Sequence, residues 1–198
     1  MSLHEHQKRR MAKRVRVNGD TFVTMISERR IRARVKQLAR QISKDYRGTV
    51  PVFIGVLNGS FIFFADLIRE VTINCEVDFF KLSSYGDAKI SSGDVKLLKD
   101  LNCQVEGRDI IIVEDIVDSG LSMEYIKHLI ERENPKSFRV VTLLYKKMAV
   151  KTAVQIDYVG FTIPKDFVIG YGLDYAQKLR NLKDIYRLKE TAGHAVDA

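Results

Sequence analysis

The chain has 198 residues, of which 45% are hydrophobic and 29% are charged, a composition and length typical of one soluble globular domain. Basic residues outnumber acidic residues by 33 to 25, and the net charge of +8 favours an anionic ligand. No stretch reaches the roughly 18 apolar residues of a membrane span, and the first residues lack the apolar core of a secretory signal. We therefore expect a cytoplasmic protein without membrane contact.

The two ends of the chain differ from its middle. Residues 1–20 are rich in lysine and arginine and contain no aromatic residue or recognisable nucleic-acid-binding motif, so we expect a flexible, solvated arm without nucleic acid. Residues 21–190 are predicted to form a single domain, and residues 191–198 a flexible tail. Cys75 and Cys103 have no second Cys or His at ligand spacing, which excludes a cysteine metal cluster and favours a reducing compartment.

Apolar residues recur at helical spacing after Thr24, at Ile31, Val35, Leu38 and Ile42, and this stripe predicts an amphipathic helix. Further along the chain, helices are predicted at 61–70 and 121–131, and strands at 50–57, 73–82, 109–113, 138–145, 158–161 and 167–170. Alternating strands and helices predict an α/β fold with a central, mostly parallel twisted sheet flanked by helices. Such a sheet binds ligands at the carboxyl ends of its strands.

Residues 109–123 carry the most informative pattern. An unbroken apolar run predicts a strand buried on both faces, and it ends in Glu114-Asp115, followed by Asp118-Ser119-Gly120 and a helix. A small, hydroxyl-rich turn that enters a helix offers unpaired N–H groups to an anion such as phosphate. Carboxylates beside it suit sugar hydroxyls, a magnesium ion or proton transfer. The pattern therefore predicts a phosphorylated sugar as the ligand.

Residues 112–120, Ile-Val-Glu-Asp-Ile-Val-Asp-Ser-Gly, resemble the phosphoribosyl-pyrophosphate (PRPP) motif of the type I phosphoribosyltransferases, and the acidic pair looks most like the hypoxanthine-guanine branch. A second match to that branch lies at residues 163–175, and the resemblance runs from about residue 51 to residue 186. It implies a fold with a mobile lid loop and a small hood. It also implies a purine salvage reaction, in which a 6-oxopurine and PRPP give IMP or GMP and pyrophosphate with the help of Mg²⁺.

The resemblance assigns roles within the first motif. Glu114 and Asp115 would hold the ribose hydroxyls and magnesium, and Asp118 would be the catalytic base near purine N7. The 5′-phosphate would be bound by Asp118, Ser119, Gly120, Leu121 and Ser122. Leu121 stands where many relatives carry lysine, but the backbone N–H groups there can still bind phosphate.

The resemblance also implies a pyrophosphate site and a lid. Asn58 and Gly59 would contact pyrophosphate through backbone groups, in a turn that often has a non-proline cis peptide, and Arg180 would contact it from the C-terminal region. Many relatives carry lysine in place of Asn58. Ser84 and Tyr85 would lie on the loop that closes over the site and excludes water.

The purine site is assigned in the same way. Lys146 would contact the exocyclic oxygen at C6, Phe167 would stack on the ring, and Val168 would bind the base edge through its backbone. Asp174 would bind magnesium together with Glu114 and Asp115. The segment after Lys146 lacks the arginine of many relatives, and Lys151 is the candidate to replace its pyrophosphate contact.

Two other functions stay open at this point. A phosphoribosyltransferase for adenine, xanthine or a pyrimidine would share the first motif, and hypoxanthine, guanine and xanthine are not ranked. A PRPP-sensing regulator could bind nucleic acid through the basic arm, although it gives no reason for Lys146 or Phe167-Val168. The resemblance further implies a homodimer or a homotetramer.

Overall fold

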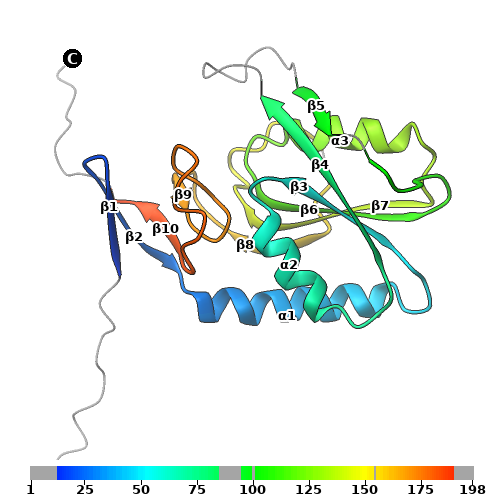
Figure 1. Ribbon diagram of the computed structural model, residues 1–198, viewed down its shortest axis with the longest axis horizontal. Helices are drawn as coiled ribbons and strands as arrows, with labels where there is room; N and C mark the ends of the chain where they lie inside the picture. Colours follow the sequence, from blue (N-terminus) through cyan, green and yellow to red (C-terminus); the bar gives the residue numbers. More distant parts are fainter. Residues whose placement is uncertain (1–12, 85–94, 100, 154, 190–198) are drawn as a thin grey trace, which may run out of the picture.

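The computed structural model describes residues 13–84, 95–99, 101–153 and 155–189. Its centre is a six-stranded sheet in the order β5-β4-β3-β6-β7-β8, in which five neighbouring strands are parallel and β5 is antiparallel to β4 (Figure 1). The strands are β3 (Val52–Leu57), β4 (Glu76–Ser84), β5 (Val95–Lys99), β6 (Asp109–Val117), β7 (Ser137–Tyr145) and β8 (Tyr158–Thr162). The predicted α/β fold with a mostly parallel central sheet is confirmed.

The central strand β6 explains why its sequence is an unbroken apolar run. Side chains alternate between the faces of a strand, and Ile110 and Ile112 pack into one buried cluster while Ile111 and Val113 pack into another. Both faces of the sheet are therefore covered, as expected for a parallel sheet.

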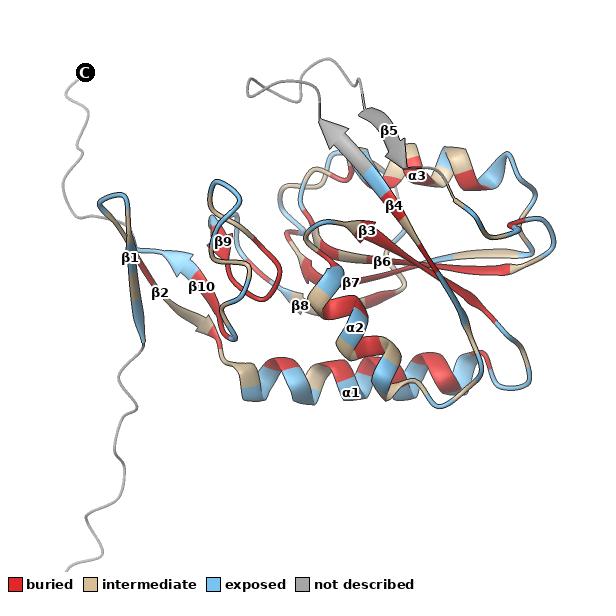
Figure 2. Ribbon diagram, viewed as in Figure 1, coloured by how far each residue is buried: buried red, intermediate tan, exposed pale blue. Residues whose placement is uncertain are grey.

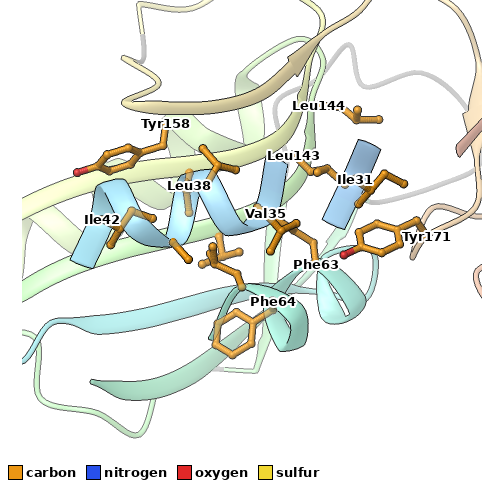
Figure 3. Close-up of a cluster of buried hydrophobic side chains, with 14 of the residues drawn as sticks. Ile31, Val35, Leu38, Ile42, Phe63, Phe64, Leu143, Leu144, Tyr158 and Tyr171 are labelled. Atoms are coloured by element: carbon orange, nitrogen blue, oxygen red, sulfur yellow. The ribbon is translucent and has the colours of Figure 1, made fainter. Parts of the chain in front are cut away.

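Helices cover the two faces unequally. Helices α1 (Glu28–Asp45) and α2 (Phe61–Glu70) lie on one face, and α3 (Leu121–Glu131) lies on the other (Figure 1). The stripe predicted from Ile31, Val35, Leu38 and Ile42 is buried in α1 and faces the sheet (Figures 2 and 3). None of the helices in the described part of the chain has the length and apolarity that a bilayer crossing requires.

A second, antiparallel sheet forms the hood beside the central one, with the strand order β1-β2-β10-β9 (Figure 1). Its strands are β1 (Arg14–Val17), β2 (Asp20–Ile26), β9 (Val168–Ile169) and β10 (Ile185–Leu188). The strand predicted at 167–170 thus belongs to the hood and not to the central sheet. Strand β1 lies within the segment assigned to the basic arm, whose first twelve residues are outside the described part of the chain.

Asp184 connects the hood to the central domain. Its side chain is buried, its Oδ1 accepts a hydrogen bond from the Glu28 N–H over 2.8 Å at the start of α1, and its Oδ2 lies 3.1 Å from Lys13 Nζ. Burial alone would raise the pKa of Asp184, but the Glu28 N–H and Lys13 outweigh it, and the pKa is below its usual value. The Asp184 carboxylate therefore caps the start of α1 and, through Lys13, also binds the segment that leads into β1 of the hood.

Candidate active site

Three parallel strands end at the same edge of the central sheet, and most of the predicted site residues follow them. Strand β3 leads into the turn at Asn58, which is entered through a cis peptide bond between Leu57 and Asn58. Strand β6 carries Glu114 and Asp115, and Lys146 follows β7. The parallel pairing of β3, β6 and β7 brings these segments together, as the sequence predicted.

In the acidic pair, Asp115 is buried and Glu114 is partly buried. Oε2 of Glu114 is inaccessible and accepts no hydrogen bond from any described residue, and Asp115 Oδ1 accepts one from the Ile116 N–H over 2.9 Å. Burial, with the neighbouring Asp115 carboxylate, raises the pKa of Glu114 well above its usual value, and burial raises that of Asp115 to about 6. Such a pair is stabilised by a cation or by hydroxyl donors.

The turn after β3 packs directly on this pair. A Cβ atom on Gly59 would lie 1.8 Å from Asp115 Oδ2, so only glycine fits there. On its other side, a Cβ on Gly172 would lie 2.1 Å from the Gly59 carbonyl oxygen. The backbone of the predicted pyrophosphate turn is therefore held between the Asp115 carboxylate and the segment that follows β9.

Asp174 and Arg180 form an ion pair at this place. Arg180 Nη2 lies 2.8 Å from Asp174 Oδ1, and Arg180 Nη1 donates to the Gly172 carbonyl over 2.8 Å. The other Asp174 oxygen accepts the Gln177 N–H. Among the described residues, no group of three or more His, Cys, Asp or Glu side chains is arranged to hold a metal by itself. The adjacent carboxylates of Glu114 and Asp115 are oxygen donors of the kind that a hard cation prefers.

The predicted phosphate loop enters α3 through Gly120, whose φ of +84° is in the left-handed region. Its carbonyl accepts the Glu124 N–H over 3.0 Å, and the N–H of Leu121, the first residue of α3, donates to Ser119 Oγ over 3.4 Å. The first turn of a helix is a place where backbone N–H groups can bind an anion. The segment after β7 lies over this loop: the Lys151 N–H donates to the Ser119 carbonyl over 2.9 Å, and a Cβ on Gly120 would lie 2.3 Å from Thr152 Oγ1. The sequence had not indicated Thr152, because a single threonine after a strand carries no signal.

Lys146 and Asp118 face each other across the same edge. The Lys146 ammonium donates to Asp118 Oδ2 over 2.6 Å, and the Lys146 N–H donates to the Val117 carbonyl over 3.0 Å. The lysine side chain is largely buried, with 10% of its surface exposed, whereas that of Asp118 is 55% exposed. The residues assigned to base recognition and to proton transfer are therefore in direct contact.

Phe167 presents an exposed aromatic face. Its surface is 48% exposed, and its ring centroid lies 6.2 Å from Phe22 and 5.9 Å from Tyr175. Two aromatic neighbours fix the ring from behind, which suits a stacking surface. Val168 is buried in β9, opposite Arg187 of β10.

The remaining predictions concern the lid. Ser84 is the last residue of β4, and Tyr85 lies outside the described residues.

The structure also reveals a backbone feature that the sequence analysis missed: Gly170, Tyr171 and Gly172 all have positive φ. The glycines on either side of an aromatic residue were the signal that could have indicated this backbone.

Comparisons with known proteins agree with this geometry. Residues 23–176 match the phosphoribosyl transferase domain family. The chain is 48% identical over 170 residues to the hypoxanthine-guanine phosphoribosyltransferase of Bacillus subtilis, covering 86% of this chain and 94% of the relative. It is 44% identical over 173 residues, or 87% of its length, to the bifunctional protein TilS/HprT of Listeria innocua, of which it spans only 27%.

A solved structure is similar along most of its length. It is a hypoxanthine-guanine phosphoribosyltransferase of Bacillus anthracis, with a TM-score of 0.80 and 44% identity over 83% of this chain and 96% of that one. This chain belongs to the phosphoribosyltransferase family.

Proposed function

We propose that the protein is a purine salvage enzyme that converts hypoxanthine, guanine or both, with PRPP, to IMP or GMP and pyrophosphate. The observation that carries this proposal is the contact between Lys146 and Asp118 beside the phosphate loop of α3. A donor and an acceptor 2.6 Å apart match the two adjacent groups of a 6-oxopurine, its O6 acceptor and its N7–H donor. The names of the relatives support the same substrates.

Each group of site residues has its own role in the proposed reaction. The N–H groups at the start of α3 hold the 5′-phosphate, and Glu114 and Asp115 accept hydrogen bonds from the ribose hydroxyls. The bond between ribose C1′ and the pyrophosphate oxygen breaks, and a bond between C1′ and purine N9 forms. The proton on N7 passes to Asp118, while the Lys146 ammonium donates to O6. Phe167 holds the ring plane by stacking.

Magnesium is part of the proposal. Glu114 and Asp115 would hold the cation, because Glu114 Oε2 accepts no hydrogen bond from any described residue and burial raises the pKa of both carboxyl groups. Asp174 would hold the cation together with them, and in the structure its two oxygens contact Arg180 and the Gln177 N–H. The chemistry that the cation supplies when bound is neutralisation of the pyrophosphate leaving group.

We also infer that the protein is a cytoplasmic homodimer or homotetramer. Its two cysteines are free, and burial raises the pKa of both thiols, which suits a reducing compartment. Analytical ultracentrifugation tests this assembly, and a monomer at micromolar concentration would contradict it.

The substrate assignment is tested by turnover with PRPP, magnesium and each base in turn. We expect hypoxanthine or guanine to react far faster than adenine or a pyrimidine. Preferred turnover of adenine or a pyrimidine would replace this assignment by another phosphoribosyltransferase activity. If no base is turned over and the protein binds nucleic acid in a salt-dependent manner, the alternative of a PRPP-sensing regulator would be favoured instead.

A further inference from the structure

Tyr171 has a backbone conformation that a bulky residue rarely adopts. Its φ is +52°, between Gly170 at +92° and Gly172 at +101°. A left-handed tyrosine is unfavourable by itself and persists only where its surroundings hold it. One restraint is the backbone, because the Tyr171 N–H donates to the Leu182 carbonyl over 2.8 Å. The side chain provides a second restraint.

The Tyr171 hydroxyl reaches α2. It donates to Asp66 Oδ2 over 2.7 Å, and the tyrosine is only 5% exposed. Its ring belongs to the same apolar cluster as Phe63 of α2, and Figure 3 shows it at one end of that cluster. Asp66 itself also lines a hollow of about 320 Å³ between α1 and α2, together with Arg32 and Arg69. Water can therefore reach Asp66 if the phenol hydroxyl is removed.

Helix α2 is the element that begins at the pyrophosphate turn. Its first residue, Phe61, follows Gly59 by two positions, and Gly59 touches Gly172, the neighbour of Tyr171. The segment 170–172 is therefore attached to the α2 region twice, through the tyrosine hydroxyl and through the contact between the two glycines. The hydroxyl contact holds Gly172 where it supports the turn.

The same segment joins two parts of the site. Val168, assigned to the base edge, precedes Tyr171 by three residues, and Asp174, paired with Arg180, follows it by three residues. We propose that the hydrogen bond from Tyr171 to Asp66 is a positioning contact, which holds the segment 168–174 against α2 and thereby sets the affinity for both substrates. Tyr171 acts through Gly172 and Gly59 and not by touching the reacting atoms. The proposal rests on the proposed function for its kinetic readout.

The chain offers a closely matched control in Tyr158. This tyrosine is 6% exposed, belongs to the same apolar cluster, and donates its hydroxyl to the Asp45 carboxylate of α1 over 3.0 Å. Figure 3 shows it at the other end of the cluster, away from Tyr171. Tyr158→Phe and Tyr171→Phe therefore each remove one buried phenol hydrogen bond to a helix carboxylate.

The two variants should differ in kinetics and not in stability. We expect similar shifts in melting temperature, and a rise of about three- to tenfold in the KM for PRPP and for the purine in Tyr171→Phe alone, with a smaller change in kcat. Asp66→Asn retains an acceptor and should be close to wild type, whereas Asp66→Ala should reproduce the Tyr171→Phe kinetics. Equal kinetics for Tyr171→Phe and Tyr158→Phe would overturn the proposal, and so would an Asp66→Ala enzyme with normal KM values.

Hydrogen exchange separates this proposal from the assignment of the reaction. The Gly172 N–H donates to the Arg180 carbonyl over 2.9 Å, and its exchange should be faster in Tyr171→Phe than in Tyr158→Phe or wild type. This readout needs no substrate. An inactive wild-type enzyme with selectively faster exchange at Gly172 would contradict the reaction and support the positioning contact. An active wild-type enzyme with unchanged exchange at Gly172 in Tyr171→Phe would support the reaction and contradict the positioning contact.

Discussion

The Lys146 ammonium and the Asp118 carboxylate satisfy each other over 2.6 Å at the edge of the central sheet. A purine that uses both groups must exchange this contact for its own O6 and N7–H. Because only 10% of the Lys146 side chain is exposed, removing the Asp118 carboxylate would leave a buried ammonium without its partner and lower stability. Stability and function are therefore measured together for substitutions at either residue.

Asp118→Asn should lower turnover strongly while the fold is retained. Asparagine has the same shape and its oxygen can still accept from Lys146, but it cannot take the N7 proton. General acid–base catalysis contributes about 10²–10⁴-fold, and we expect a loss in that range in the chemical step. Single-turnover kinetics with a melting curve measures both properties. A stable variant with near-normal chemistry would remove Asp118 from the catalytic role and leave it as part of the helix entry.

Lys146→Ala should reduce the preference for hypoxanthine over adenine. A hydrogen bond from a charged donor contributes about 1.5–3 kcal/mol, or roughly tenfold to a hundredfold in kcat/KM. The exposed neighbour Lys147 is the matched control, since Lys147→Ala removes the same charge without touching Asp118. Competition between the two bases gives the ratio directly, and an unchanged ratio in Lys146→Ala would contradict the assignment.

Asp115→Asn should stabilise the ligand-free protein at neutral pH. The folded state raises the pKa of Asp115 to about 6. Below the unfolded-state pKa of about 4, Asp115 is protonated in both the folded and the unfolded protein, so its burial costs no stability. As the pH rises from there to about 6, the unfolded protein ionises Asp115 more readily than the folded protein does, and stability is lost. The gain in Asp115→Asn should grow from near zero at pH 4 to about 2–3 kcal/mol above pH 6. Denaturant unfolding across this range tests it, and a gain independent of pH would contradict the explanation.

Gly59→Ala should abolish productive PRPP binding. The added Cβ would lie 1.8 Å from Asp115 Oδ2, so either the turn or the carboxylate must move. Gly48→Ala is the control: Gly48 has a φ of +82° and open space around it, so its variant should lose about 1 kcal/mol of stability and keep its activity. Calorimetric titration with PRPP and magnesium compares the two, and equal affinities would show that the turn tolerates the displacement.

Much of the central domain could be predicted because its signals are local. The stripe in α1 and the apolar run of β6 each specify an element within one stretch of sequence. The boundaries expected for the second and third helices, 61–70 and 121–131, are confirmed. The parallel sheet then follows from the alternation of elements. The site residues on strand ends converge for the same reason.

The hood could not be predicted in this way. Strands β1 and β10 have only four residues each, too few for a clear alternation, and the strand predicted at 167–170 gave no sign that it pairs with β10 and not with the central sheet. They pair residues near both ends of the chain, such as Phe22 with Leu188, and such pairing depends on the whole fold. The contact between Gly172 and Gly59 and the hydrogen bond from Tyr171 to Asp66 join segments more than 100 residues apart, and composition carries no signal for them.

The cap that Asp184 places on α1 determines when, during synthesis of the chain, the start of this helix can reach its final structure. The helix is synthesised long before its cap, because the carboxylate that accepts its Glu28 N–H lies 156 residues later in the sequence. Contacts of such long sequence separation form late, because the loop between them must close first. The start of α1 and the hood beside it can therefore acquire their final structure only once Asp184 has been synthesised, and a polypeptide truncated before Asp184 would be left with a frayed start of α1.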